Sequence, residues 1–187
     1  DPHDQHGQNL ASIISDYGMG NDNRVILSTQ KVPPEILSIL YNLADCTINI
    51  SDAEGFGLAT LESLSCETPI IVSMTGGLQE QVTDGEQWFG IGIEPSSKAV
   101  IGSQSVPYIN EDRVSKGDFI RALKEIYNMS REEREELGKK GRTHIENNYN
   151  FDTFNKQWVE IVDLAIEKHR SWEERRGYQS WQLREIA

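Results

Sequence analysis

Apolar positions along the first two thirds of the chain alternate between two periods. Short runs rich in Val, Ile and Leu predict strands at residues 24–28, 46–50, 69–73 and 88–93. Apolar residues at helical spacing predict helices at residues 8–17, 34–44, 57–66 and 77–82. Strands separated by helices imply a parallel sheet, and nearly all-apolar strands fit a sheet covered on both faces. The pattern therefore predicts an α/β protein with a Rossmann-like, doubly wound parallel sheet.

This alternation ends near residue 93. We expect a hairpin that pairs Ile91–Ile93 with Ala99–Ile101, followed by an irregular loop. The remainder reads as C-terminal helices at residues 116–129, 131–147 and 151–169. Ser130 and Asp152 are the expected N-caps, and Ser130 with Glu133 fits a capping box.

Composition and charge place the chain among ordinary globular proteins. Hydrophobic residues make up 37% and charged residues 26%, with a net charge of −12. The acidic excess lies in residues 1–110, which hold fourteen acidic residues and three basic ones, Arg24, Lys31 and Lys98. Because that part lacks a basic patch, we expect no nucleic-acid partner.

The cysteines and the hydropathy of the chain indicate in which cellular compartment we expect the protein. Cys46 and Cys66 lie in apolar stretches without a CxxC motif, which predicts two reduced thiols rather than a disulfide or a metal site. No apolar run reaches the roughly 20 residues that a membrane span needs. These features favour an intracellular, cytoplasmic protein.

The stretch from Ser51 to Glu62 carries the candidate chemistry. It follows a predicted strand and opens a predicted helix, which is where ligands bind in an open parallel sheet. Gly55 and Gly57 allow close approach of the backbone, and the helix start offers N–H groups to an anion such as a diphosphate. Glu54 and Glu62 are placed to accept hydrogen bonds from the hydroxyls of a sugar and a ribose. The plainer alternative is a glycine turn with two surface acids.

The same stretch resembles the two-glutamate motif of retaining GT-B glycosyltransferases of family 4, the glycosyl transferases group 1. Further blocks follow in the family's order and resemble its AD, EGFGL, LEAMAC, xPVV, GGxxE and DG segments: Ala44-Asp45, Glu54–Leu58, Leu61–Cys66, Thr68–Val72, Gly76–Glu80 and Asp84-Gly85. Gln79 replaces the family's usual proline, and the 94–114 segment is unusual, which indicates a divergent subfamily.

The resemblance implies a role for each matching residue. Glu54 would be the catalytic carboxylate at the donor sugar, and Glu62 would hold the ribose hydroxyls. The loop and helix start would bind the sugar and diphosphate through Gly55, Phe56, Gly57 and Leu58. Lys31 and Val32 would lie near the base. The implied reaction retains the anomeric configuration, uses a nucleotide-diphospho-sugar as substrate, and needs no metal and no cofactor.

The resemblance also implies partners outside this chain. We expect residues 1–170 to form an incomplete donor-binding domain, and residues 171–187, with Trp172 and Trp181, to be a helix crossing to an absent N-terminal domain. Family members supply an arginine and a lysine to the leaving diphosphate, and residues 1–110 offer neither at that place. We therefore expect this chain alone to be inactive, with an acceptor that the sequence does not identify.

Two other classes of function remain open from the residues alone. One is a non-catalytic nucleotide-sugar-binding or scaffold domain, and the other is a GT-B-fold epimerase or phosphorylase. A metal site is conceivable at the N-terminus, which carries Asp1, His3, Asp4 and His6. Because the two histidines lie three residues apart in a loop without a third fixed ligand, we predict no metal there.

Overall fold

The computed structural model describes residues 8–20 and 24–170. The chain divides into two compact units, Asp1–Leu40 and Tyr41–Ala187, and each is described by itself. Asp1, His3, Asp4 and His6 lie outside the described residues, as do Trp172 and Trp181 and the predicted crossing helix.

The first unit contains one short helix and the beginning of a second. Helix α1 (Leu10–Asp16) starts after Asn9, whose Oδ1 accepts a hydrogen bond from the Ser12 N–H at 3.0 Å. Helix α2 (Pro34–Leu43) begins at a proline, as predicted. The predicted strand at residues 24–28 was wrong. A strand needs a neighbouring strand, neither sheet formed by the described residues includes residues 24–28, and Ile26 is 85% exposed.

The second unit is built on a three-stranded parallel sheet. Its strands, in spatial order, are β1 (Thr47–Asn49), β2 (Ile70–Ser73) and β3 (Gly90–Ile93). Ile71 of the central strand faces Ile48 on one side and Ile91 on the other. Every residue of β2 is buried, which explains why its sequence is almost wholly apolar. The predicted α/β class and parallel sheet are confirmed.

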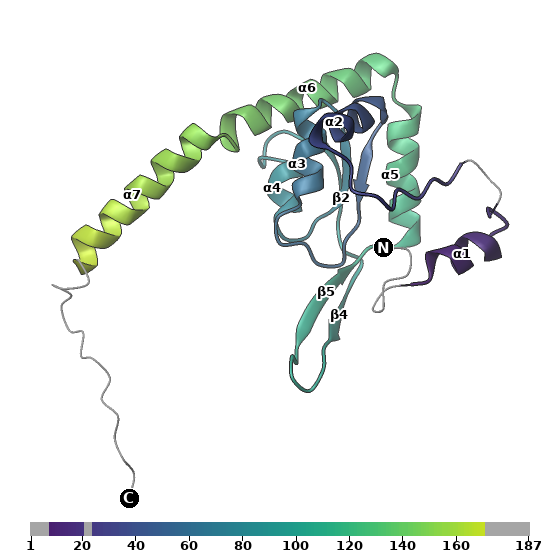
Figure 1. Cartoon of the computed structure of the whole chain (residues 1–187), viewed down its shortest axis with the longest axis horizontal. Coiled ribbons are helices and arrows are strands. Elements are labelled where there is room, and N and C mark those ends of the chain that lie inside the picture. The colour runs from purple at the N-terminus through teal and green to yellow at the C-terminus, as the bar shows by residue number, and fades with distance from the viewer. Residues whose placement is uncertain (1–7, 21–23, 171–187) are drawn as a thin grey trace, which may run out of the picture. The chain divides into compact units, whose positions relative to one another are not determined.

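Helices cover both faces of this sheet. Ile70 and Val72 pack in a core with α3 (Leu58–Ser65), α4 (Leu78–Val82) and the C-terminal part of α6 (Arg131–Asn148). Ile71 points to the opposite face, where it packs with Ala122 and Ile126 of α5 (Lys116–Asn128). Figure 1 shows α3 and α4 on one side of β2 and α5 on the other. Successive residues of β2 thus pack alternately against the helices on one face and the helix on the other.

A two-stranded hairpin projects from the second unit between β3 and α5 (Figure 1). It consists of β4 (Ser97–Ile101) and β5 (Ile109–Arg113), paired antiparallel. The predicted hairpin partner, Ile91–Ile93, was wrong: β3 pairs with β2 in the parallel sheet, and β4 pairs with β5. The segment predicted as an irregular loop supplies the second strand instead.

The C-terminal helices follow the predicted boundaries closely. Ser130 caps α6 through the Glu133 N–H, and the Glu133 carboxylate returns to the Ser130 N–H, so the capping box is confirmed. Asp152 is not the cap of α7 (Phe151–His169). Asn150 starts that helix by accepting from the Thr153 N–H at 2.8 Å, which places Asp152 in the first turn. Among the described residues, no helix is both long and apolar enough to cross a membrane.

Both cysteines carry free thiols, as the sequence predicted. Cys46 and Cys66 are half-buried, and burial raises the pKa of each thiol above its usual value. Neither thiol is therefore activated as a nucleophile by its surroundings.

Candidate functional site

The candidate site begins where β1 ends. Asn49 is the last residue of this strand, and its Oδ1 accepts hydrogen bonds from the Ser51 N–H at 3.1 Å and the Ser51 hydroxyl at 2.8 Å. The Asn49 Nδ2 donates to the Glu54 Oε2 at 3.3 Å. One amide thus fixes the first turn of the loop and holds the Glu54 carboxylate. The sequence placed Asn49 at the strand end but did not reveal this contact.

The loop after β2 packs directly against the loop that carries Glu54. A Cβ on Gly76 would overlap the Glu54 carbonyl oxygen, and one on Gly77 would lie 2.8 Å from the Phe56 carbonyl oxygen. Both distances are too short for a side chain, so the two backbones can meet only because these residues are glycines. The Gly76-Gly77 pair therefore supports the Glu54–Phe56 backbone.

Helix α3 starts without a side-chain cap. Gly57 is its N-cap, in the left-handed region at φ 88° and ψ 63°, and no side chain bonds to the first helical N–H groups. A Cβ on Gly57 would lie 2.6 Å from Leu78 Cδ2, so space as well as backbone angle calls for glycine. Such a helix start presents backbone donors and a positive dipole end, which suit an anionic group.

A fully buried glutamine holds the Glu54 loop in place through hydrogen bonds. Gln81 of α4 is 0% exposed, and its Nε2 donates to the Phe56 carbonyl oxygen. Its Oε1 accepts from the hydroxyl of Thr60, which also lies 2.7 Å from the Gly57 carbonyl oxygen. Gln81 therefore joins the loop, the N-cap and the first turn of α3. A helix was predicted here, but its polar contact could not be read from the sequence.

Glu62 lies on α3, eight positions after Glu54. Its Oε2 accepts a hydrogen bond from the Tyr41 hydroxyl at 2.9 Å. Burial, then the hydrogen bond to Glu62, then the charge of Glu62 raise the pKa of Tyr41 to about 12. The phenol is therefore protonated across the neutral range and stays a donor to Glu62. No pattern in the sequence indicated that Tyr41 belongs to the site.

The base of the β4–β5 hairpin joins the two loops. The Asp112 N–H donates to the Asp52 carbonyl oxygen at 2.7 Å, and the Thr75 hydroxyl donates to Asp112 Oδ2 at 2.8 Å. Arg113 Nη1 donates to Asp52 Oδ2 at 2.6 Å and also pairs with Glu111. Strand β5 thereby connects the loop after β1 to the loop after β2. Arg113 is a cation near the site that the sequence reasoning missed, and two carboxylates already compensate its charge.

The family model described as glycosyl transferases group 1 matches residues 8–144. The chain belongs to this family. A D-inositol 3-phosphate glycosyltransferase of Paenarthrobacter aurescens is 27% identical over 163 residues, which cover 87% of this chain and 32% of that protein. The enzyme of the same name from Acidothermus cellulolyticus is 35% identical over 79 residues, 42% of this chain and 17% of that protein. The chain therefore spans about a third or less of the length of these relatives.

A solved structure shares the fold of this group 1 chain. The sucrose-phosphate synthase from Thermosynechococcus elongatus matches it with a TM-score of 0.64 and 23% identity, over 88% of this chain and 37% of that one. At this identity the likeness shows the fold alone. The group 1 chain accordingly has the Rossmann-like α/β architecture of a GT-B glycosyltransferase domain.

Most residues predicted for the group 1 site belong to the loop after β1 and to α3. Glu54 to Gly57 form the end of the loop, Leu58 is the first residue of α3, and Glu62 lies four positions into that helix. The side chains of Phe56 and Leu58 line a groove of about 980 Å³ that also includes Tyr149. The predicted contacts of Phe56 and Leu58 with the donor use their backbone amides and not these side chains. The role of each of these residues stays a prediction.

The remaining predicted residues lie elsewhere in the chain. Lys31 and Val32 belong to the first unit, just before α2, and their predicted place near the base stays a prediction. Among residues 8–20 and 24–170, no group of three or more His, Cys, Asp or Glu side chains is arranged to hold a metal ion.

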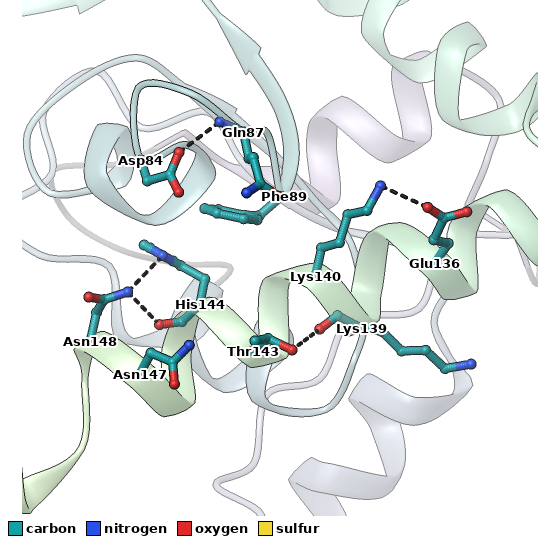
Figure 2. Close-up of a pocket in the computed structure, with 10 residues that line it drawn as sticks. All are labelled: Asp84, Gln87, Phe89, Glu136, Lys139, Lys140, Thr143, His144, Asn147 and Asn148. Atoms are coloured by element: carbon teal, nitrogen blue, oxygen red, sulfur yellow. Dashed lines mark hydrogen bonds and ion pairs between the residues drawn. The ribbon is translucent and has the colours of Figure 1, made fainter.

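A separate hollow of about 330 Å³ lies beside α6 (Figure 2). The His144 ring stacks on Phe89 there, with ring centroids 4.2 Å apart. Its Nε2 lies 2.9 Å from the Glu80 carbonyl oxygen, which can only accept, so Nε2 donates and Nδ1 accepts from Asn148 Nδ2 at 3.0 Å. These contacts hold α6 against α4. Neither Glu54 nor Glu62 lines this hollow.

Proposed function

We propose that this group 1 chain binds a nucleotide-diphospho-sugar and is the donor-binding half of a retaining glycosyltransferase. One observation carries the proposal: the uncapped start of α3 follows the carboxyl end of β1, with Glu54 held by Asn49 in the loop before it and Glu62 held by Tyr41 four positions into the helix. The carboxyl ends of the strands are where open α/β sheets bind ligands. Acceptors before and after an anion-binding helix start match a ligand with hydroxyls on both sides of a diphosphate.

Each part of the site has a place in this proposal. Glu62, held by Tyr41, would accept hydrogen bonds from the ribose hydroxyls. Backbone N–H groups at Gly57 and Leu58 would meet the diphosphate. Glu54, held by Asn49, would contact hydroxyls of the transferred sugar and would be the catalytic carboxylate next to the carbon that reacts. Fixed donors aimed at the leaving diphosphate stabilise the charge that develops there, without metal or cofactor.

Two features of the proposal extend beyond this chain. The acceptor is a glycan, lipid or protein that a second domain would bind. A part of the donor-binding domain outside this chain would supply cations to the leaving diphosphate. Support comes from the relatives, of whose length the matches to this chain cover only 17% and 32%. Both Lys98 and Arg113, the only basic residues between Tyr41 and Arg113 in the sequence, are paired with carboxylates.

Calorimetric titration of the chain with UDP, GDP and ADP tests the proposal first. We expect one of the three to bind, and the matching sugar nucleotide to compete with it.

The bound sugar nucleotide is then followed by NMR. Conversion of the sugar without release of nucleotide would identify an epimerase. Binding without any reaction, even when the full-length protein and acceptors are supplied, would identify a binding or scaffold domain. Failure of all three nucleotides and their sugars to bind would overturn the proposal.

A further inference from the structure

Tyr41 and Glu62 are 21 positions apart in the sequence, and their contact joins helices α2 and α3. Tyr41 lies in the last turn of α2, and Glu62 lies in the middle of α3. The Tyr41 hydroxyl donates to Glu62 Oε2 at 2.9 Å, a normal length for this type of bond. Glu62 is otherwise exposed, so this bond restricts a side chain that water would leave free.

The main chain of Tyr41 is itself anchored in the buried part of the unit. Its carbonyl oxygen accepts from the Thr68 hydroxyl at 2.8 Å, and Thr68 is only 4% exposed. The Thr68 N–H donates to the carbonyl oxygen of Ser63 at 3.0 Å, and Ser63 is 0% exposed. Tyr41 therefore reaches Glu62 from a fixed backbone position rather than from a mobile helix end.

The bond leaves Glu62 able to accept from a ligand. An ionised carboxylate has about four acceptor positions, and Tyr41 occupies one of them. Glu62 Oε1 stays available, and its direction is set because Oε2 is held. Since burial and Glu62 keep the pKa of Tyr41 near 12, the phenol does not lose this proton at neutral pH.

We infer that Tyr41 is a positioning residue that orients Glu62 toward the ribose hydroxyls, and that this pair makes the site distinguish ribose from 2′-deoxyribose. The inference rests on the proposed function, since it assigns Glu62 to the ribose. A correctly aimed carboxylate gains a bond from each hydroxyl, and a carboxylate that samples several rotamers gains less. A site built to bond a hydroxyl discriminates against the analogue that lacks it.

Paired ribose and deoxyribose ligands test this inference. UDP, GDP and ADP and their 2′-deoxy analogues are titrated by calorimetry into wild type, Tyr41→Phe and Glu62→Gln. The ribonucleotide that binds should bind wild type about tenfold more tightly than its deoxy analogue. In Tyr41→Phe this ratio should fall to about twofold, because the ribonucleotide loses more affinity than the deoxy analogue, which has only one of the two hydroxyls. Glu62→Gln should lower the ratio at least as far. Tyr127→Phe, which alters an 84% exposed tyrosine on α5, is the matched control.

Each outcome decides a separate question. A Tyr41→Phe variant that weakens both ligands equally would show a merely structural tyrosine and overturn the inference. If Glu62→Gln abolishes the preference for ribose and Tyr41→Phe keeps it, the inference about Tyr41 would also be overturned. The proposed function would stand in that case. Absence of nucleotide binding by folded wild type would overturn both. If Tyr41→Phe does not fold, Tyr41→His, whose ring is too short to reach Glu62 from the same backbone, replaces it in the same titration.

Discussion

Gly76 lies so close to Glu54 that a Cβ at position 76 would overlap the Glu54 carbonyl oxygen. The two residues are on different loops, one after β1 and one after β2, and each loop follows a strand of the same sheet. Because no side chain separates the two backbones, the loop after β2 supports the Glu54 loop directly. The GG pair therefore shapes the proposed site although neither glycine has a side chain to bind a ligand.

Gly76→Ala should unfold or displace this loop. Gly76 has φ +49°, so alanine adds left-handed strain of about 1–2 kcal/mol to an overlap costing about 1–3 kcal/mol. Gly85→Ala is the matched control, because Gly85 also has positive φ, at +93°, with nothing within 4 Å of its Cβ. Urea unfolding should show a loss for Gly76→Ala beyond that of Gly85→Ala. Equal losses would mean that the loop moves aside at no cost.

Exchanging one carboxylate at a time should separate the two glutamates. Glu62→Gln should weaken binding of the nucleoside diphosphate by about 1.5–3 kcal/mol, the range for a hydrogen bond to a charged group. Glu54→Gln should leave that affinity unchanged and weaken only the intact sugar nucleotide. Glu86→Gln, an exposed acid in the turn after α4, serves as control. Loss of nucleoside diphosphate binding in Glu54→Gln would contradict this division of roles.

Removal of the buried amide at Gln81 should destabilise the unit through the loop. Gln81→Leu leaves the Phe56 carbonyl oxygen without its donor, which costs about 1–3 kcal/mol when the group stays buried. Thr60→Val removes the other partner of the same amide. A double-mutant cycle by urea unfolding should give a coupling above about 0.5 kcal/mol between Gln81 and Thr60. Additive losses would indicate that the two side chains act independently.

Tyr41 should make stability fall in alkaline solution. Its pKa is raised from 10.0 to about 12 in the folded chain, so the unfolded chain loses the proton first. The contribution is complete below pH 10.0 and is lost as the pH rises toward about 12. Tyr149, whose pKa burial also raises, acts in the same direction. Tyr41→Phe should therefore reduce the alkaline fall in unfolding free energy without abolishing it.

The control for this pH series is Tyr127→Phe, which changes an exposed tyrosine and should keep the wild-type dependence. Urea unfolding at several pH values between pH 8 and pH 11 (roughly the span around the ordinary tyrosine pKa) gives the comparison. A Tyr41→Phe variant with the wild-type pH dependence would show that burial and the bond to Glu62 do not raise the pKa of Tyr41 in the folded chain.

Local patterns in the sequence determined much of this protein. The all-apolar run at Ile70–Val72 predicts a buried strand, because only a sheet covered on both faces hides consecutive apolar residues. Ser130 and Glu133 predict the start of α6, since a capping box involves neighbours three residues apart. The ordered blocks from Ala44 to Gly85 indicate the family, and the family match covers them. In each case the interacting residues are close in sequence or follow a fixed period.

Only the tertiary structure decided which distant residues meet. Residues 24–28 have strand-like composition but belong to neither sheet formed by the described residues, and sheet formation is a property of two segments. Strand β4 pairs with β5 rather than with β3, and that choice depends on residues 97–113 and not on the local pattern of either strand. Tyr41 reaches Glu62 across 21 positions and Gln81 reaches Phe56 across 25. Sequence periodicity reports the face on which a residue lies, whereas these contacts depend on how helices and loops pack in three dimensions.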